Sequence, residues 1–186
     1  MKKLSVSIFA FVMVFASITA QEKKVNTETS SIVWKGYKVT GSHTGTLAIK
    51  EGALVFKNEK LSGGEFVVDM TTLTVTDLEG GMKGKLEGHL KSDDFFSVEK
   101  NTTSKLIFTV DSVKGKNAYA ATGKLTIKGI TKPVSFEISI YGSKATASLK
   151  IDRTDYDIKY KSGSFIENLG DKAIYDDFDL VVDLEF

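Results

Sequence analysis

Hydrophobic and polar residues alternate along most of the chain beyond its first twenty residues. In the clearest example, residues 178–186, apolar side chains occupy every second position, and three of the four positions between them are acidic. Because successive side chains of a strand point to opposite faces, this stretch predicts a strand with one apolar face. The same period recurs at 66–70, 106–110, 119–127, 134–140 and 145–151. The pattern predicts a mainly antiparallel, all-β chain with about eight long strands.

The phase of the alternation changes in the first strand region. Ile32 and Trp34 are out of phase with Tyr37 and Val39, and Gly36 lies between the two pairs. A change of phase at a glycine is typical of a β-bulge or a sharp bend. We therefore expect an irregular strand here.

Two further apolar pairs predict a hairpin. Leu47 and Ile49 form one pair, and Leu54 and Phe56 form the other. Residues 50–53 between them contain a glycine, so we expect the turn of the hairpin at these four positions.

One segment breaks the period of two. Leu78, Met82, Leu86 and Leu90 recur at every fourth position, which places them on one face of a helix. Four glycines in the same segment weaken it, because each interior glycine costs roughly 1 kcal/mol relative to alanine. We expect a short, irregular helix at about residues 78–91, with its leucine and methionine face turned inward to close one end of the fold.

Residues 88–96 complete this segment and end on two adjacent aromatic residues, Phe95 and Phe96. The two rings would point in different directions from a strand but to a similar side from a helical turn. We expect a turn that buries both rings against the apolar faces of the strands.

The regular spacing of long, one-sided strands suits either a β-sandwich or a closed barrel. Closure removes exposed strand edges, and eight strands enclose an interior wide enough for packed side chains or for one small ligand. Alternation alone leaves a filled core and a hollow interior both open, with the filled core favoured.

The first twenty residues predict a targeting signal. A basic start is followed by an apolar run and by a small-residue cleavage site that ends at Ala20. The apolar run is too short to span a bilayer, which needs about 20 apolar residues. We expect a signal peptide at residues 1–20 and one domain at residues 21–186, exported to the periplasm or secreted, without stable membrane insertion.

Composition narrows the possible functions. The 25 basic and 24 acidic residues nearly balance, so no nucleic-acid partner is expected. The chain has no cysteine and two histidines, His43 and His89, in no metal-binding spacing, and we expect neither a metal nor a cofactor. The sequence contains no GxSxG or GxGxxG motif, so no catalysis is expected.

Three stretches resemble the YceI-like family of exported lipid-binding proteins. They are residues 88–96, residues 123–134 and residues 151–156, in the order and spacing of the family. The resemblance implies an eight-stranded antiparallel, lipocalin-like barrel whose apolar interior holds a polyisoprenoid or a similar long-chain lipid, such as a quinone precursor. It also implies transport, storage or sequestration rather than catalysis.

The sequence departs from the family pattern at two places. Residues 99–104 stand where family members often have an aromatic-proline pair, and Asp157 stands where they commonly have glycine. We therefore expect the entrance and the length of the ligand to differ from those of other family members.

With the resemblance, a ligand tunnel becomes the favoured interpretation of the apolar interior. The candidate ligand-binding residues are Trp34, Phe56, Phe66, Val68, Met70, His89, Phe95, Phe96, Phe108, Leu125, Ile127, Phe136 and Ile138. For His89, a structural role at the end of the helix is favoured over contact with a ligand head group. For Arg153, an ion pair that fixes the end of the barrel is favoured over contact with the polar end of a ligand.

A small outer-membrane barrel is the alternative. Such barrels also alternate with a period of two, with the apolar face outward, and their last strand often ends in an aromatic residue, as Phe186 does here. A homodimer is left open.

Overall fold

The computed structural model describes residues 20–186. The elements of this part of the chain are β1 (Ala20–Lys24), β2 (Ser31–Lys38), β3 (Gly41–Lys57), β4 (Lys60–Val75), α1 (Gly80–Lys91), β5 (Thr103–Val113), β6 (Ala118–Ile127), β7 (Ile130–Tyr141), β8 (Lys144–Asp152), η1 (Arg153–Tyr156), η2 (Gly170–Lys172) and β9 (Ile174–Glu185). The expected signal peptide lies outside the described residues, apart from Ala20, which begins β1.

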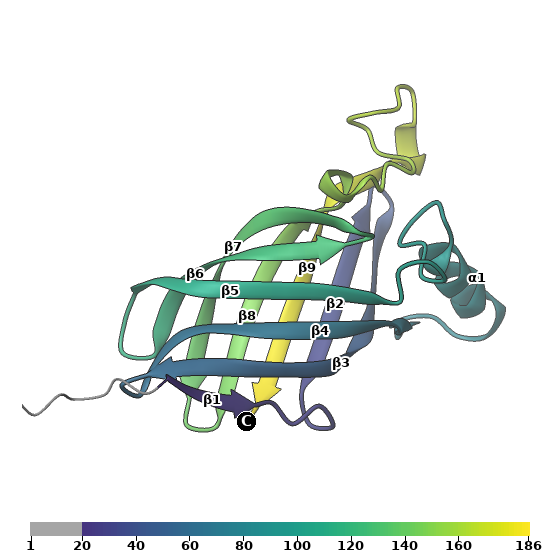
Figure 1. Ribbon diagram of the computed structural model, residues 1–186. Coiled ribbons are helices and arrows are strands. Elements are labelled where there is room, and N and C mark those ends of the chain that lie inside the picture. The colour runs from purple at the N-terminus through teal and green to yellow at the C-terminus, as the bar shows by residue number, and fades with distance from the viewer. Residues whose placement is uncertain (1–19) are drawn as a thin grey trace, which may run out of the picture.

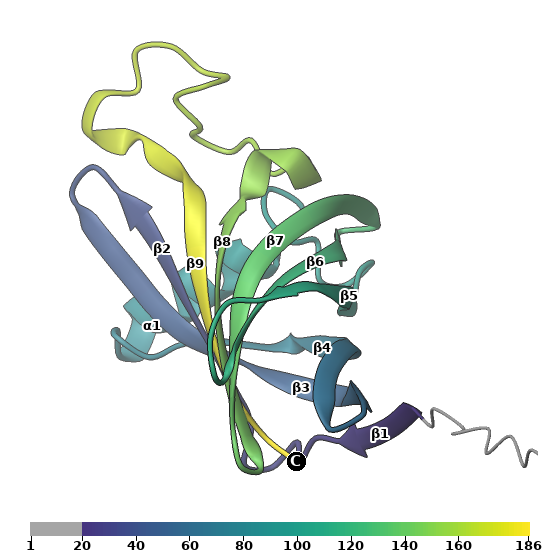
Figure 2. The same cartoon turned by 90° about the vertical axis from the view of Figure 1, so that its left-hand side faces the viewer.

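Strands β2 to β9 form a closed barrel. Each strand pairs antiparallel with the next one along the chain, and β9 pairs with β2 to complete the ring. The short strand β1 pairs with the second half of β3, beyond the part of β3 that pairs with β2. The ring is visible in Figures 1 and 2. The prediction of an eight-stranded antiparallel barrel is confirmed, with β1 as an added edge strand.

The two ends of the barrel differ. One, which we name the α1 end, carries α1, the turn between β6 and β7, and the long loop from η1 to β9. Figure 2 shows that loop rising beyond the barrel wall. The other, which we name the C-terminal end, carries β1, the last residues of β9 and the turns β3–β4, β5–β6 and β7–β8 (Figure 1).

The bulge expected near Gly36 is confirmed, since the pairing of β2 with β9 shifts register between Gly36 and Lys38. The hairpin turn expected at residues 50–53 is wrong. Strand β3 continues through these residues, and a register shift against β4 between Ile49 and Glu51 absorbs the change of phase that the sequence shows.

The turn between β3 and β4 lies instead at Asn58 and Glu59. Their φ angles of 49° and 63° are both positive, as a two-residue type I′ turn requires. Asparagine adopts this backbone region more readily than most residues. The right-handed twist of such a turn matches the twist of the strands that it joins.

Helix α1 lies against β4 at the α1 end (Figure 1). The carboxylate of Glu87 accepts hydrogen bonds from Thr74 Oγ1 at 2.6 Å and from the Val75 amide at 2.9 Å. Leu86 and Leu90 are half-buried, but Met82 is 64% exposed, so its expected inward position is wrong. The helix is attached through its second half, where Glu87 lies, and its first turn remains in solvent.

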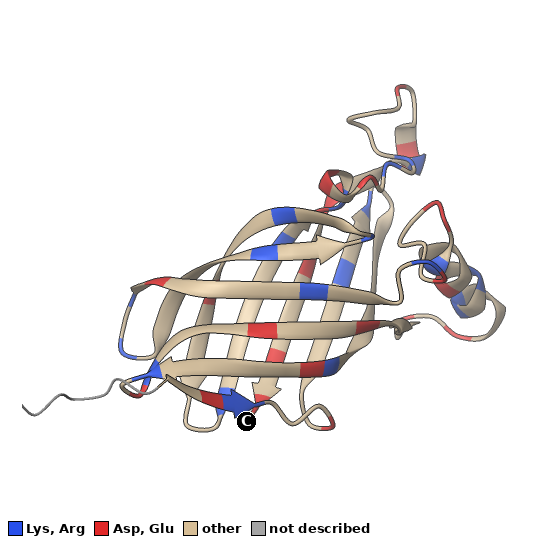
Figure 3. Cartoon of the chain, viewed as in Figure 1, with Lys and Arg blue, Asp and Glu red and all other residues tan. Residues whose placement is uncertain are grey.

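The outer surface of the barrel is polar. Charged residues are spread over the outward faces of the strands, as Figure 3 shows for the near face. On β9, for example, Asp179 and Asp183 alternate with Leu180 and Val182, which pack against the core. Within residues 20–186, no helix is long and apolar enough to cross a bilayer.

Candidate functional site: an apolar cavity at the α1 end

The half of the barrel nearer the C-terminal end is filled by aromatic side chains. The rings of Phe66 and Phe108 are stacked with their centroids 6.4 Å apart, and the ring of Phe136 meets that of Phe108 edge-on at 5.2 Å. Two glycines make room for these rings. A Cβ atom at Gly64 would lie 2.7 Å from Phe108 Cε1, and one at Gly123 would lie 2.9 Å from Phe108 Cβ.

The half nearer the α1 end contains a cavity of about 170 Å³ with an almost wholly apolar surface. Residues of β2, β3, β4, β5, β6 and β9 form its walls, and α1 and the turn after it cover it. The apolar lining consists of Ile32, Trp34, Leu47, Val68, Met70, Leu73, Leu86, Leu90, Phe95, Phe96, Leu125, Ile127, Ile174, Phe178 and Leu180.

Seven of the predicted ligand-binding residues line this cavity, namely Trp34, Val68, Met70, Phe95, Phe96, Leu125 and Ile127. The indole of Trp34 donates a hydrogen bond from Nε1 to the carbonyl oxygen of Thr74 at 3.2 Å. Its ring lies over Gly45, where a Cβ atom would approach Trp34 Cζ2 to 2.6 Å. The only tryptophan of the chain is thus fixed in the cavity wall.

The other six predicted residues lie elsewhere. Phe56, Phe66, Phe108, Phe136 and Ile138 are buried in the hydrophobic core, outside the cavity lining. His89 lies on α1, and its ring is nearly perpendicular to those of Phe95 and Tyr160, with centroids 5.0 and 4.5 Å away. Whether any of the thirteen residues binds a ligand stays a prediction.

Phe95 and Phe96, which we call the aromatic plug, cover the cavity. The turn that carries them is fixed by backbone hydrogen bonds from the Phe95 amide to the carbonyl of Ser92 and from the Phe96 amide to the carbonyl of Leu90, both at 3.1 Å. Phe95 is buried, and Phe96 is half-buried with its ring edge-on to Phe178 at 6.3 Å. The turn expected at this position is therefore present, although it leaves Phe96 partly exposed.

Arg153 fixes the rim beside the aromatic plug. Its guanidinium is buried and donates hydrogen bonds to the carbonyl oxygens of Tyr175, Ile158 and Ile174 at 2.6–3.0 Å and to Asp176 Oδ1 at 3.2 Å. Burial lowers the pKa of Arg153, and the negative charge of Asp176 opposes this shift. The ion pair that the sequence favoured is present, and it joins the start of β9 to η1 and the loop that follows.

Several polar residues of the lining were not predicted. Tyr37, Lys38, His43, Asp177 and Ser104 all contribute to the cavity surface. Tyr37 donates a hydrogen bond to Asp179 at 2.6 Å, and this bond raises the pKa of the Tyr37 phenol. His43 Nδ1 lies 3.0 Å from Asp77 Oδ2.

Ser104 differs from these residues because it is buried on an apolar face. Ser104 lies on the same inward face of β5 as Leu106, Phe108 and Val110. The alternation therefore could have predicted a serine on an otherwise apolar inward face. Residues 20–186 contain no cluster of three histidine, aspartate or glutamate side chains that could hold a metal ion.

The pairing order and the interior together define an up-and-down β-barrel with an internal apolar cavity at one end. Residues 23–186 match the YceI-like domain, and the chain therefore belongs to the YceI-like family.

Curated relatives match over part of their length. A UPF0312 protein of Shewanella denitrificans is 33% identical over 92 residues, which are 50% of this chain and 46% of that protein. A UPF0312 protein of Serratia proteamaculans is 33% identical over 98 residues, 53% of this chain and 48% of that protein. The matched region thus spans about half the length of these curated relatives.

Solved structures share the fold at low sequence identity. Burkholderia cenocepacia BcnA has a TM-score of 0.62 at 19% identity, covering 86% of this chain and 98% of that one. A polyisoprenoid-binding domain from Saccharophagus degradans, implicated in plant cell wall breakdown, has a TM-score of 0.58 at 13% identity, covering 90% and 98%. These likenesses support the barrel fold.

Proposed function

We propose that this protein is a periplasmic binding or carrier protein that holds an isoprenoid or other long-chain amphiphilic lipid in its barrel and catalyses no reaction. The observation that carries the proposal is the apolar cavity beneath the aromatic plug. Burial of apolar surface is favourable by roughly 25 cal/mol per Å², so an apolar chain in this cavity gains free energy from nearly every contact. Family membership and the polyisoprenoid-binding domain of Saccharophagus degradans support the same ligand class.

The size of the cavity limits how such a ligand is held. Its volume of about 170 Å³ is close to that of an engineered cavity of about 150 Å³ that binds benzene. A long chain exceeds this volume. It would extend out of the cavity past polar residues of the lining such as Tyr37 and Lys38, or it would separate the phenylalanine rings of the filled half.

Native mass spectrometry of the protein purified from its own host, followed by organic extraction, tests the proposal. We expect a lipid in stoichiometric amount. Val68→Phe should reduce the lipid content because Val68 lines the cavity. Val67→Phe is the matched control, since Val67 is the adjacent residue on the opposite face of β4. Repeated recovery of lipid-free wild-type protein would refute the proposal.

The outer-membrane barrel remains the alternative function. It requires an apolar outer face, whereas Asp179 and Asp183 of β9 and Lys150 of β8 belong to outward faces that are rich in charge (Figure 3). Cell fractionation separates the two functions, because recovery of the protein without detergent is expected only for the carrier. A structural barrel with a filled core would instead bind no lipid under any condition.

A further inference from the structure

The hydroxyl of Ser104 is a buried polar group without a partner. Ser104 is 7% exposed, and its Oγ makes no hydrogen bond within residues 20–186. Leaving a buried hydroxyl unsatisfied costs about 1–3 kcal/mol, so such groups are rare in folded proteins. The position therefore calls for an explanation.

Ser104 is one of the residues that line the cavity. It is the second residue of β5 and lies in register with Val68 of β4, which is also in the lining. The inward alternation of β5 points its side chain into the interior, together with that of Leu106. The unpaired hydroxyl therefore faces the space that a ligand would occupy.

Of the other polar residues of the lining, Lys38, Tyr175 and Asp177 are at least partly exposed to solvent, and the remaining three have partners within the protein. Tyr37 is bonded to Asp179, His43 to Asp77, and the Arg153 guanidinium to three carbonyl oxygens and Asp176. Ser104 differs because its polar atom is both buried and without a partner within the described residues. It also ends the segment in which this sequence departs from the family pattern.

We propose that the Ser104 hydroxyl forms a hydrogen bond with an uncharged oxygen of the bound lipid, such as a hydroxyl or carbonyl group. The inference rests on the proposed function and adds where the polar group of the lipid is held, namely beside Ser104. One hydroxyl in apolar surroundings satisfies a neutral oxygen, but it leaves a phosphate or carboxylate without the partners that a buried charge needs. Ser104 thus selects neutral, oxygen-bearing isoprenoids and orients them toward β4 and β5.

The single tryptophan allows a direct test. Trp34 lies in the cavity wall, so its fluorescence should change when the cavity is occupied. The probes are all-trans-farnesol, the hydrocarbon with hydrogen in place of its hydroxyl, and farnesyl phosphate. Wild-type protein should bind farnesol more tightly than either of the other two probes.

Ser104→Ala should weaken farnesol binding by about three- to tenfold, the range of one net hydrogen bond, and leave hydrocarbon binding unchanged or slightly tighter. Ser104→Thr, which keeps a hydroxyl, should restore the preference for farnesol over the hydrocarbon. Ser148→Ala is the control, because Ser148 lies on the outer face of β8. The Tm of ligand-free Ser104→Ala should not fall, since no hydrogen bond within the protein is lost.

Three results would overturn the inference, in distinguishable ways. If wild-type protein binds farnesol and the hydrocarbon but Ser104→Ala shifts both affinities equally or neither, the role of Ser104 is refuted while lipid binding stands. If wild-type protein binds none of the three probes, the proposed function fails and the inference fails with it. Tighter binding of farnesyl phosphate than of farnesol would also refute the selection of a neutral group.

Discussion

The two halves of the barrel are built from the same strands but are packed differently. Toward the C-terminal end, the rings of Phe66 and Phe136 both pack against that of Phe108 in the core. Toward the α1 end, smaller residues such as Val68 and Leu125 face a cavity, and the largest ring, that of Trp34, lies along the wall over Gly45. We expect the packed rings of the filled half to supply much of the stability of a barrel whose other half is hollow.

Among the variants that test the difference between the filled and the hollow half, Phe108→Ala should have the largest effect. Removing a buried phenylalanine costs about 3–5 kcal/mol, since both its burial and its ring contacts are lost. For a chain of this size, each kcal/mol lowers the Tm by roughly 2–4 °C. Thermal and urea unfolding should show the loss, and Phe165→Ala, at a position that is 55% exposed, should change the free energy of unfolding by less than about 0.5 kcal/mol. If the two variants lowered the free energy of unfolding equally, the packed rings around Phe108 would not be the stabilising half of the barrel.

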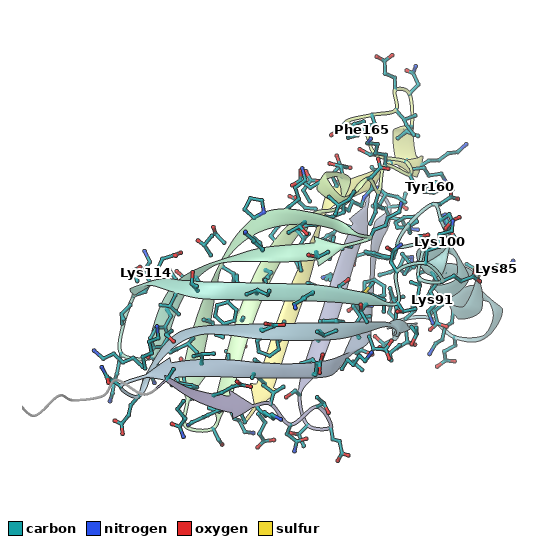
Figure 4. The ribbon with its side chains drawn as sticks, in the orientation of Figure 1. Lys85, Lys91, Lys100, Lys114, Tyr160 and Phe165 are labelled. Carbon is teal, nitrogen blue, oxygen red and sulfur yellow. The ribbon has the colours of Figure 1, made fainter. Side chains whose placement is uncertain are left out.

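Phe96→Ala tests the aromatic plug, which separates the cavity of the hollow half from solvent. Phe96 is half-buried and contacts Phe178, so we expect a smaller loss of about 1–3 kcal/mol together with faster loss of the bound lipid. Unfolding and the lipid content after dialysis measure the two effects. An unchanged Tm with unchanged lipid content would show that the aromatic plug neither stabilises the barrel nor retains the lipid. Phe165→Ala again serves as control, because Phe165 lies in the loop beyond the barrel (Figure 4).

The smallest expected effect concerns the attachment of α1. Hydrogen bonds from Thr74 and Val75 lower the pKa of Glu87 below its ordinary value of 4.5. A lowered pKa in the folded state means that the stabilisation is complete above the ordinary value and is lost as the pH falls through the lowered value. Hydrogen exchange of the α1 amides should therefore accelerate in acid.

Glu87→Gln supplies the control for that experiment. It should show faster α1 exchange already at neutral pH and a weaker dependence on acid than wild type. Lys85, which is also on α1 (Figure 4), has no hydrogen bond or ion pair within the described residues, so Lys85→Gln should leave the exchange unchanged. Identical pH profiles for wild type and Glu87→Gln would refute the role of Glu87.

Much of the fold follows from the sequence because alternation reports directly which side chains face inward. The inward faces of β4 to β9, the bulge near Gly36 and the helix after β4 were all predicted. The turn at residues 50–53 was wrong because a bulge inside a long strand changes the phase in the same way as a hairpin does. The exposed position of Met82 could not be predicted, since helical spacing defines a face but not how far along the helix the barrel reaches.

The site was less predictable than the fold. Alternation places Phe108 and Leu125 equally on the inside, but it does not say that one belongs to the filled half and the other to the cavity. That division depends on ring volumes that meet across the barrel and on glycines such as Gly64 that admit them. Three partners of Arg153 are the carbonyl oxygens of residues 158, 174 and 175, whose positions depend on the course of a loop.

The closing pair of strands also has a consequence for folding. Every other pairing in the ring joins neighbours along the chain, whereas β9 and β2 join Ser31 to Asp183. An emerging chain can form the curved sheet early, but its first and last edges stay unpaired until β9 is available, and such non-local pairing is slow. We therefore expect the cavity to close only when β9 pairs with β2, so that a lipid present at that step is enclosed without passing the aromatic plug.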